Sequence, residues 1–321
     1  MNRPNLKNNT ILIVGGAGFI GSTLADKLIE SVNSNIIIVD NLFSGRKENL
    51  SLAITNGATI YIDDLEFDGT LDYIFNNHDI DIVFNCATKP LNYSFINPSS
   101  AYMTNLTVLK NLLEFQRKNA FSTLCHFSSS EVYGSALFER MDEQHPLNPT
   151  TTYAAGKGAA DLLLQSYVKM FNLDAFIVRP FNNYGPRQNF EGPLAGVIPV
   201  TIKKILEGKA PEIHGSGKQT RDFIFVEDTV HLVTKAFPLI PAGECVNITN
   251  DQQLSVEEVI NTIVEAMGYT GKIIKKKERK SDVINHRGSN EKLESLVGRI
   301  QKTNFKEGIE RTIDWIKNEI K

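Results

Sequence analysis

Cysteine is scarce in this sequence, which excludes several kinds of site. Only three cysteines, Cys86, Cys125 and Cys245, occur among the 321 residues. Three scattered thiols are too few for a disulfide framework, and neither they nor the six histidines have the spacing of a metal site. We therefore expect free thiols, mostly buried in apolar runs, in a reducing cytoplasm, and no bound metal.

The sequence also lacks long apolar runs and an excess of positive charge. No stretch approaches the ~20 apolar residues of a membrane-spanning helix, and the first residues, MNRPNLKNNT, lack the apolar core of a signal peptide. The formal net charge of −3 argues against nucleic acid, whose phosphates require a basic surface. The basic run KIIKKKERK, residues 272–280, is expected to be a solvated edge strand or loop. We thus expect a cytoplasmic protein with neither a membrane nor a nucleic acid as partner.

Short β-branched runs alternate with helix-length segments through the first half of the chain. Continuous apolar strands separated by helices are typical of a parallel sheet that is covered on both faces. The sequence therefore predicts an α/β fold of the Rossmann type, with a doubly wound parallel sheet. The predicted strands are TILIVGG, NIIIVD, ATIYID, DIVFNCA, TLCHFSSS and DAFIVRP.

Beyond Arg179 the pattern becomes irregular and richer in proline and glycine, with further strand-like runs at FIFVED and CVNIT. We expect a smaller α/β substrate-binding lobe over the carboxyl edge of the sheet. The predicted division assigns residues 1–180, together with 222–250, to the Rossmann domain. It assigns 181–321, mainly 181–221 and 251–321, to the substrate-binding lobe. The segment 308–320 has helical apolar spacing, with Trp315 on its buried face.

The segment ILIVGGAGFIGS carries a glycine-rich turn. Gly15, Gly18 and Gly21 follow a predicted strand and open a predicted helix. Glycine there lets the backbone turn tightly and lets a pyrophosphate approach the amino end of the helix. Asp40 ends the next strand about 20 residues later, at the position of a ribose-binding acid. Because a carboxylate there repels a 2′-phosphate, the sequence favours an NAD site over an NADP site or a purely structural turn.

Later strand ends supply further candidate NAD contacts. Asp64 and Leu65 end the third strand, where an acid can reach the adenine amino group, and NCATK ends the fourth, where small residues let the backbone approach the cofactor. The predicted NAD-binding residues are Gly15, Gly18, Phe19, Ile20, Asp40, Asn41, Ser44, Gly45, Asp64, Leu65, Cys86, Ala87, Thr88, Lys89, Tyr153 and Lys157.

Tyr153 and Lys157 lie about one helical turn apart in YAAGK, so their side chains share a helix face. A neighbouring ammonium stabilises phenolate and lowers the pKa of a tyrosine from its usual ~10. Such a tyrosine can take a proton from a sugar hydroxyl while a hydride leaves the same carbon. The alternative is a surface Tyr and Lys on an amphipathic helix. The glycine turn and a serine-rich strand end favour the catalytic interpretation.

With these motifs, the sequence resembles the extended short-chain dehydrogenases/reductases of the nucleotide-sugar epimerase/dehydratase family. The resemblance covers nearly the whole chain and implies an NAD-dependent enzyme that transfers hydride at carbon 4 of a nucleotide sugar, with UDP as the expected nucleotide. It depends on GGAGFIGS, DNLFSGR, SSSEVYG, NPTTTYAAGK, RPFNNYGPR and GSGKQTRDFIFVED.

The resemblance also implies roles for individual residues. Ser129 would orient the sugar 4-hydroxyl, Tyr153 would act as the base, and Lys157 would hold the nicotinamide ribose. Asn182 and Arg221 match the family's contacts to the diphosphate of the substrate. The predicted substrate-binding residues are Ser129, Ser130, Asn182, Arg187, Val197, Arg221 and Arg287, of which Arg287 is a loose match to a second phosphate arginine.

Glu131 falls between the subclasses of this family. Its 4,6-dehydratases carry an Asp-Glu pair at the positions of Ser130 and Glu131, and 4-epimerases usually have small uncharged residues there. UDP-glucuronate decarboxylases have a hydroxyl-hydroxyl-Glu run with added basic residues. The leading hypothesis is oxidation or reduction at carbon 4 of a UDP-hexose or UDP-N-acetylhexosamine, with Glu131 as a catalytic residue that exchanges the carbon 5 proton.

Such an enzyme would serve a bacterial glycan route, for example one to pseudaminic acid. A UDP-glucose or UDP-GlcNAc 4-epimerase is the second hypothesis and a UDP-glucuronate decarboxylase the third. A catalytically inactive NAD sensor is the alternative from a different class, and the presence of both Tyr153 and Lys157 disfavours it.

Two helical segments, 99–117 and 152–170, carry apolar positions on more than one face. Family members commonly bury the second face by pairing two subunits through a four-helix bundle. We therefore expect a homodimer, and double burial within one subunit is the alternative.

Overall fold

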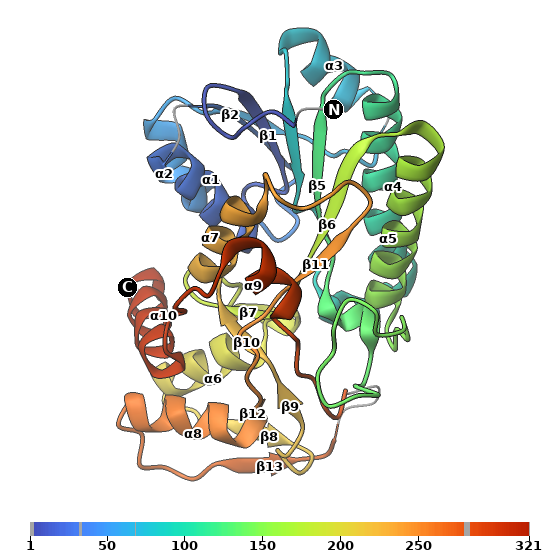
Figure 1. Ribbon diagram of the computed structural model, residues 1–321. Helices are drawn as coiled ribbons and strands as arrows, with labels where there is room; N and C mark the ends of the chain where they lie inside the picture. The colour runs from blue at the N-terminus through green and yellow to red at the C-terminus, as the bar shows by residue number, and fades with distance from the viewer. Residues whose placement is uncertain (1–2, 32–33, 68, 279–282, 321) are drawn as a thin grey trace.

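Figure 1 shows the computed structural model of the protein, in which a large sheet with helices on both faces stands above a smaller part. The structure describes residues 3–31, 34–67, 69–278 and 283–320. The last two residues of the basic run KIIKKKERK lie outside these described residues.

The large sheet contains seven parallel strands in the order β11-β6-β5-β4-β1-β2-β3. This order confirms the predicted doubly wound fold. The direction of winding reverses between β1 and β4, and in such folds ligands bind beyond the carboxyl ends of the strands at that point. The strands are β1 Thr10–Val14, β2 Asn35–Asp40, β3 Thr59–Ile62, β4 Ile82–Asn85, β5 Thr123–Phe127, β6 Asp174–Pro180 and β11 Cys245–Ile248.

The two faces of β1 pack into separate apolar cores, because successive side chains of a strand point to opposite faces. Ile11 and Ile13 belong to the core that holds helices α1 and α7, whereas Leu12 and Val14 belong to the core that holds α3, α4 and α5. Figure 1 shows the two groups of helices on opposite sides of the sheet. The helices are α1 Phe19–Ser31, α2 Ser51–Thr55, α3 Thr70–Asn77, α4 Pro98–Arg117, α5 Thr152–Phe171 and α7 Val226–Ala236.

The run FIFVED does not join the large sheet, although CVNIT does, as β11. Phe223–Phe225 form β10, which pairs with β7, Asn182–Tyr184. Helix α7 begins at Val226, so the second half of the predicted strand is helical. Glu227 and Asp228 lie in the first turn of this helix, where negative charge is favoured by the helix dipole.

The smaller part has an apolar core of its own, which contains Tyr184, Phe225, Val259 and Ile313. Trp315 packs half-buried against this core, edge-on to the ring of Phe190. It thus lies on the inner face of its helix, as the helical spacing predicts. This separate core supports the two-lobe division of the chain, which we keep as a proposal. Its elements are α6 Val197–Leu206, β8 Glu212–His214, β9 Thr220–Arg221, β12 Leu254–Ser255, α8 Val256–Ala266, β13 Ile274–Lys276 and α10 Phe305–Ile320; helix α9 is Glu291–Val297.

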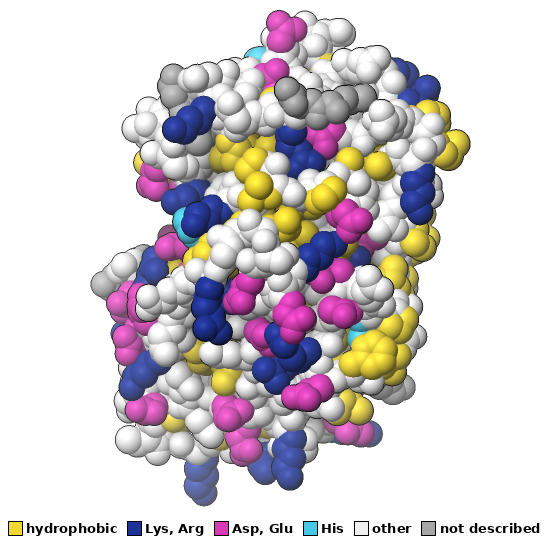
Figure 2. Space-filling view, in the orientation of Figure 1, with side chains coloured by type: hydrophobic (Ala, Val, Ile, Leu, Met, Phe, Trp, Pro, Cys, Tyr) yellow, Lys and Arg dark blue, Asp and Glu magenta, His cyan; other side chains and the backbone are white. Residues whose placement is uncertain are grey.

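The surface carries both signs of charge. Figure 2 shows acidic and basic side chains interspersed over the visible face. The basic run contributes β13, an exposed edge strand that pairs with β8, as predicted. Among the helices that the structure describes, none is both long and apolar enough to cross a membrane.

Candidate active site

The glycine turn after β1 forms a tight cradle for a ligand. Gly15 has φ +73°, and a Cβ atom there would lie 2.7 Å from the backbone nitrogen of Ala87. A Cβ on Gly21 would lie 2.2 Å from the carbonyl oxygen of Gly15, so helix α1 can approach the turn only without a side chain. Because α1 begins at Phe19, its free N–H groups face the same turn and favour an anion.

Beside this turn lies a cavity of about 280 Å³, which we call the cofactor cavity. The residues present fit a dinucleotide, because a cradle that only glycine fits, a helix amino end and a carboxylate meet there. Of the predicted NAD contacts it is lined by Gly15, Gly18, Phe19, Ile20, Asp40, Asn41, Ser44, Asp64, Leu65, Cys86, Ala87, Thr88 and Lys89. The other predicted NAD contacts, Gly45, Tyr153 and Lys157, are not lining residues, and a Cβ on Gly45 would be 2.9 Å from the Oδ1 atom of Asp40.

Asp40 ends β2 with its carboxylate almost completely buried. Its Oδ2 accepts a hydrogen bond from the Ala17 N–H at 2.9 Å, and its Oδ1 accepts one from the Leu42 N–H at 2.8 Å. Burial raises the pKa of this carboxyl group, and these backbone hydrogen bonds oppose the rise. A carboxylate has about four lone-pair sites, so Asp40 keeps acceptor capacity for a ribose.

A contact that the sequence analysis missed holds Lys89 at the cofactor cavity. Its Nζ lies 3.7 Å from the centroid of the Phe43 ring and 4.0 Å from Glu66 Oε1. The hydroxyl of Thr104 on α4 donates to the same oxygen at 2.8 Å. No local spacing reveals this group, because its members come from four separate segments of the chain.

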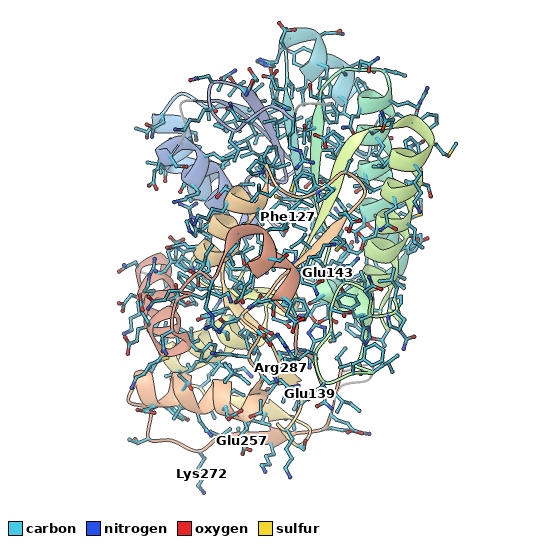
Figure 3. The ribbon with its side chains drawn as sticks, in the orientation of Figure 1. Phe127, Glu139, Glu143, Glu257, Lys272 and Arg287 are labelled. Carbon is cyan, nitrogen blue, oxygen red and sulfur yellow. The ribbon has the colours of Figure 1, made fainter. Side chains whose placement is uncertain are left out.

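Helix α5 presents Tyr153 and Lys157 to the carboxyl edge of the sheet. The helix begins at Thr152, and the hydroxyl of Thr151 caps it by accepting from the Ala154 N–H. Lys157 is 2 % exposed, and its Nζ donates to the carbonyl oxygen of Phe127 at 2.7 Å. Figure 3 labels Phe127, which ends β5. Burial lowers the pKa of Lys157 to about 8, and the nearby carboxylate of Asp161 opposes this shift.

The Tyr153 hydroxyl lies among groups that come from two other segments of the chain, one with Thr88 and one with Ser129 and Glu131. Burial raises its pKa to about 12, hydrogen bonds with Ser129 and Thr88 lower it, and the charge of Glu131 raises it. The net direction is opposite to the lowered pKa that the YAAGK spacing predicts, because burial outweighs the hydrogen bonds. An additional positive charge near the phenol would favour the phenolate.

Ser129 and Glu131 reach the site on a short 3₁₀ helix, η3, which spans Ser130–Tyr133. Ser129 is the cap residue of this helix, and its Oγ accepts from the Glu131 N–H at 3.3 Å. The structure thus brings Ser129, Tyr153 and Lys157 together. Glu131 is only 8 % exposed and faces a second cavity.

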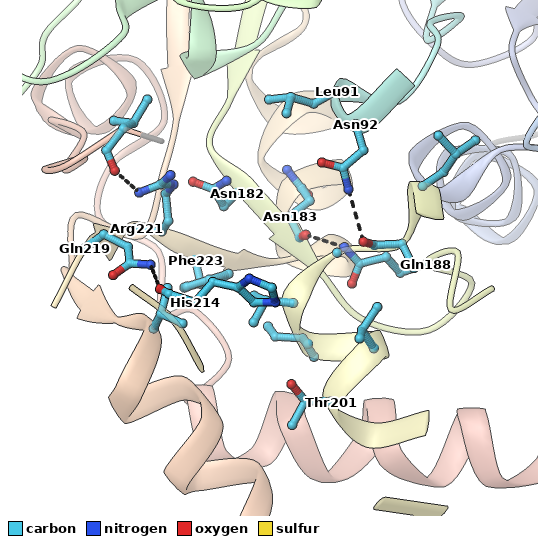
Figure 4. Close-up of a pocket in the computed structure, with 18 of the residues that line it drawn as sticks. Leu91, Asn92, Asn182, Asn183, Gln188, Thr201, His214, Gln219, Arg221 and Phe223 are labelled. Carbon is cyan, nitrogen blue, oxygen red and sulfur yellow. Dashed lines mark hydrogen bonds between the residues drawn. The ribbon is translucent and has the colours of Figure 1, made fainter. Parts of the chain in front are cut away.

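This second cavity, which we call the substrate cavity, has a volume of about 430 Å³. Among its lining residues are the predicted substrate contacts Asn182, Val197 and Arg221, together with Glu131, which was predicted as a catalytic residue. Figure 4 shows Arg221 beside Asn182, and Arg221 Nη1 donates to the carbonyl oxygen of Val283 at 2.7 Å. The cavity is also lined by the charged and polar side chains of Lys204, Glu212, His214 and Gln219.

The two cavities adjoin each other, and Ser129, Tyr153 and Lys157 line neither of them. Gln188, Leu194 and Gly196 line both cavities. Thr88, which hydrogen-bonds Tyr153, lines the cofactor cavity, whereas Glu131 lines the substrate cavity. The Tyr153 hydroxyl therefore interacts with one lining residue of each cavity, through a hydrogen bond with Thr88 and through the charge of Glu131.

Besides Ser129, which bonds Tyr153, three predicted substrate contacts do not line the substrate cavity. Arg187 adopts φ +70°, lines the cofactor cavity and forms an ion pair with Asp26 at 2.5 Å. Arg287, labelled in Figure 3, donates to Asp251 at 3.1 Å, and neither cavity has it as a lining residue. Ser130 is buried and lines neither cavity either. Their roles in substrate binding stay predictions without support from the geometry.

His286 is a buried residue beside the site that the sequence analysis missed. Its Nε2 lies 3.2 Å from the carbonyl oxygen of Ser130, and its ring packs 5.0 Å from the ring of Phe181. Burial lowers its pKa to about 3, so the imidazole is neutral near pH 7.

No grouping of three or more His, Cys, Asp or Glu side chains in the described part of the chain could hold a metal ion.

Comparisons with known proteins agree with this geometry. A family model described as "NAD dependent epimerase/dehydratase family" matches residues 11–249. A protein of Methanocaldococcus jannaschii named "Putative UDP-glucose 4-epimerase" is 36% identical over 96% of this chain and 98% of its own length.

Two solved structures are similar over almost the whole chain. A UDP-glucose 4-epimerase of Thermotoga maritima with UDP-glucose has a TM-score of 0.91 at 29% identity, covering 97% of this chain and 100% of its own. A UDP-N-acetylglucosamine 4-epimerase of Methanobrevibacter ruminantium in complex with UDP-N-acetylmuramic acid has a TM-score of 0.90 at 29% identity, covering 98% and 99%.

Proposed function

Because this chain belongs to the NAD dependent epimerase/dehydratase family, we propose that it is a 4-epimerase of a UDP-hexose or a UDP-N-acetylhexosamine. The observation that carries this proposal is that the Tyr153 hydroxyl bonds Ser129 and also interacts with one lining residue of each cavity, Thr88 and Glu131. The names of the similar proteins, which are 4-epimerases of UDP-sugars, support the choice of reaction.

Each residue of the site has its own role in such a reaction. Ser129 orients the 4-hydroxyl, and Tyr153 accepts its proton and later returns it. Lys157, fixed to the Phe127 carbonyl, supplies the positive charge that favours phenolate. NAD, the cofactor of this family, supplies a hydride acceptor at carbon 4 when it is bound.

The substrate cavity offers groups for both ends of a nucleotide sugar. Arg221 and Asn182 are placed to hold the diphosphate, since a guanidinium and an amide can both donate to phosphate oxygens. The end lined by Glu212 and His214 then receives the nucleotide base. With these groups holding the nucleotide, the sugar ring lies between Glu131 and Tyr153.

A single observation favours a second activity. Glu131 puts a nearly buried carboxylate into the substrate cavity beside Tyr153. Once carbon 4 is a ketone, the carbon 5 proton is acidic, and Glu131 could exchange it. Ser130 stands where the dehydratases carry an acid, and a serine hydroxyl is not one, so loss of the 6-hydroxyl has no acid from that position. The expected bacterial route to sugars such as pseudaminic acid, the cytoplasmic location and a decarboxylase activity stay predictions.

Incubation with UDP-glucose or UDP-GlcNAc in deuterated water separates the two activities. We expect clean interconversion of the gluco and galacto forms, with no deuterium at carbon 5 for a plain epimerase. If Glu131 works as a base, carbon 5 becomes labelled, and Glu131→Gln abolishes the label. Absence of interconversion with any UDP-hexose or UDP-N-acetylhexosamine would overturn the epimerase proposal.

We also propose that two subunits pair through α4 and α5. The two helices pack against each other and still expose large apolar side chains, namely Met103, Leu162, Met170 and Phe171. A second copy of the same pair would cover these side chains in a four-helix bundle. In gel filtration we expect a dimer that Leu162→Glu converts to a monomer. A wild-type protein that elutes as a monomer at micromolar concentration would contradict the pairing.

A further inference from the structure

A buried pair of charges lies one helical turn beyond Lys157 on α5. Asp161 is 2 % exposed, and its Oδ2 accepts from Arg179 Nη2 at 2.6 Å and from Ser128 Oγ at 2.7 Å. Arg179, on β6, also donates to the hydroxyl of Tyr133 at 2.6 Å. Within the described part of the chain, the other carboxylate oxygen of Asp161 has no hydrogen-bond partner. That oxygen lies 4.0 Å from Nε2 of His126.

Asp161 is near enough to the reactive residues to act on them by charge. Side chains four residues apart on a helix have Cβ atoms about 5–6 Å from each other, so Asp161 and Lys157 share a face. Burial is the largest influence on both reactive groups, lowering the pKa of Lys157 to about 8 and raising that of Tyr153 to about 12. The carboxylate of Asp161 raises the pKa of both groups.

Titratable groups on neighbouring elements also lie close to Tyr153 and Lys157. Burial raises the pKa of the Cys86 thiol, which follows β4, to about 12, and it holds the pKa of His126 on β5 well below its usual value. Both groups are therefore neutral near pH 7. Glu131 on η3 raises the pKa of Tyr153, and Arg179 on β6 is paired with Asp161. Asp161 is thus the charge that acts on both members of the reactive pair.

We propose that Asp161 is a positioning residue whose buried carboxylate, held by Arg179 and Ser128, keeps Lys157 protonated. Through Lys157 it sets the pH at which the Tyr153–Lys157 pair becomes active; this inference rests on the proposed function. A buried ammonium without a nearby carboxylate releases its proton at lower pH, and a neutral lysine does not stabilise phenolate.

The direction of the expected effect follows from coupled titration. Side chains about one helical turn apart are neighbours, so Tyr153 and Lys157 are expected to titrate as a coupled pair. The acid limb of the pH–rate profile then reports the first proton that the pair loses, whichever residue releases it. Removal of the negative charge of Asp161 lowers the pKa of both groups. The acid limb must therefore move to lower pH, and the share of molecules with phenolate and ammonium together must change as well.

The test is the pH profile of kcat/KM for the UDP-sugar that the wild type converts. Asp161→Asn is expected to move the acid limb down by about one pH unit, which is a typical effect of one nearby charge on a pKa. Asp161→Glu keeps the charge and is the matched control, with an unmoved limb. A readout without turnover is the ultraviolet absorbance of tyrosinate, taken as the difference between each variant and its Tyr153→Phe counterpart.

Asp161→Asn leaves Arg179 buried without its partner, which can unfold the protein. The double variant Asp161→Asn/Arg179→Gln removes both charges and keeps polar side chains of similar size, so it serves where the single variant does not fold. We expect the same direction of shift in it. If both the acid limb and the tyrosinate titration stay within about 0.2 pH units of wild type, with only a uniform loss of rate, Asp161 is structural and the inference is wrong. If the tyrosinate titration shifts but no UDP-sugar is converted, the inference stands and the proposed function fails.

Discussion

Replacing Tyr153 with phenylalanine is expected to lower kcat by about 10³-fold, because it removes the group that accepts the sugar proton. Its hydroxyl bonds Ser129 and Thr88. The ring itself stays, so the cofactor cavity keeps its shape and NAD binding should be unchanged. Turnover of UDP-glucose at saturating substrate and NAD fluorescence titration measure the two quantities.

Tyr167→Phe is the matched control for this substitution. It removes a hydroxyl from the same helix, α5, where Tyr167 donates to Glu114 Oε1 at 2.6 Å and lines neither cavity. We expect nearly wild-type turnover from it. A Tyr153→Phe enzyme within a few-fold of wild type would show that another group accepts the proton, and the assignment of Tyr153 would be wrong.

Gly15→Ala is expected to weaken NAD binding by roughly 100-fold. The new Cβ would lie 2.7 Å from the nitrogen of Ala87 and 2.9 Å from the carbonyl carbon of Cys86, so the backbone that lines the cofactor cavity must move. Overpacking of this kind costs about 3 kcal/mol, and a loss of that size in binding free energy corresponds to roughly 100-fold in Kd. Isothermal titration with NAD measures the loss.

Gly57→Ala separates the clash from the backbone strain. Gly57 also has positive φ, +81°, but nothing lies within 4 Å of its added Cβ. This control should lose about 1 kcal/mol of unfolding free energy, the cost of a left-handed conformation for alanine, and should bind NAD as the wild type does. Equal NAD affinity in the Gly15 variant and in this control would show that the cofactor cavity tolerates a side chain at Gly15.

Features with a local pattern were predictable from the sequence. The strands of the large sheet appear as apolar runs, the glycine turn follows one of them directly, and Tyr153 and Lys157 share a face because they are about one turn apart. Asp40 could be found because it ends a strand at the distance from the turn that a βαβ unit imposes. In each case a short stretch of chain determines where the side chain points.

Features that depend on distant contacts were not predictable in the same way. Arg187 is paired with Asp26, 161 residues away, and nothing in NNYGPRQ indicates that partner. The carbonyl of Ser130 lies beside His286, 156 residues further along the chain. The second half of FIFVED is helical, because its acidic residues lie in the first turn of α7, which begins directly after β10. In all three, tertiary packing decides between local alternatives of similar energy.

The late position of β11 in the chain has a consequence for biosynthesis. Asn247 on this strand accepts from the Tyr133 hydroxyl at 2.9 Å, and its own N–H donates to Glu143, so the turn that carries Ser129 and Glu131 is anchored 114 residues downstream. A growing polypeptide can form the glycine turn early, but this anchor is missing until residues 245–248 leave the ribosome. Until then the outer edge of β6 is unpaired and can pair with a wrong strand. During that interval a chaperone that covers this edge would prevent such misfolding.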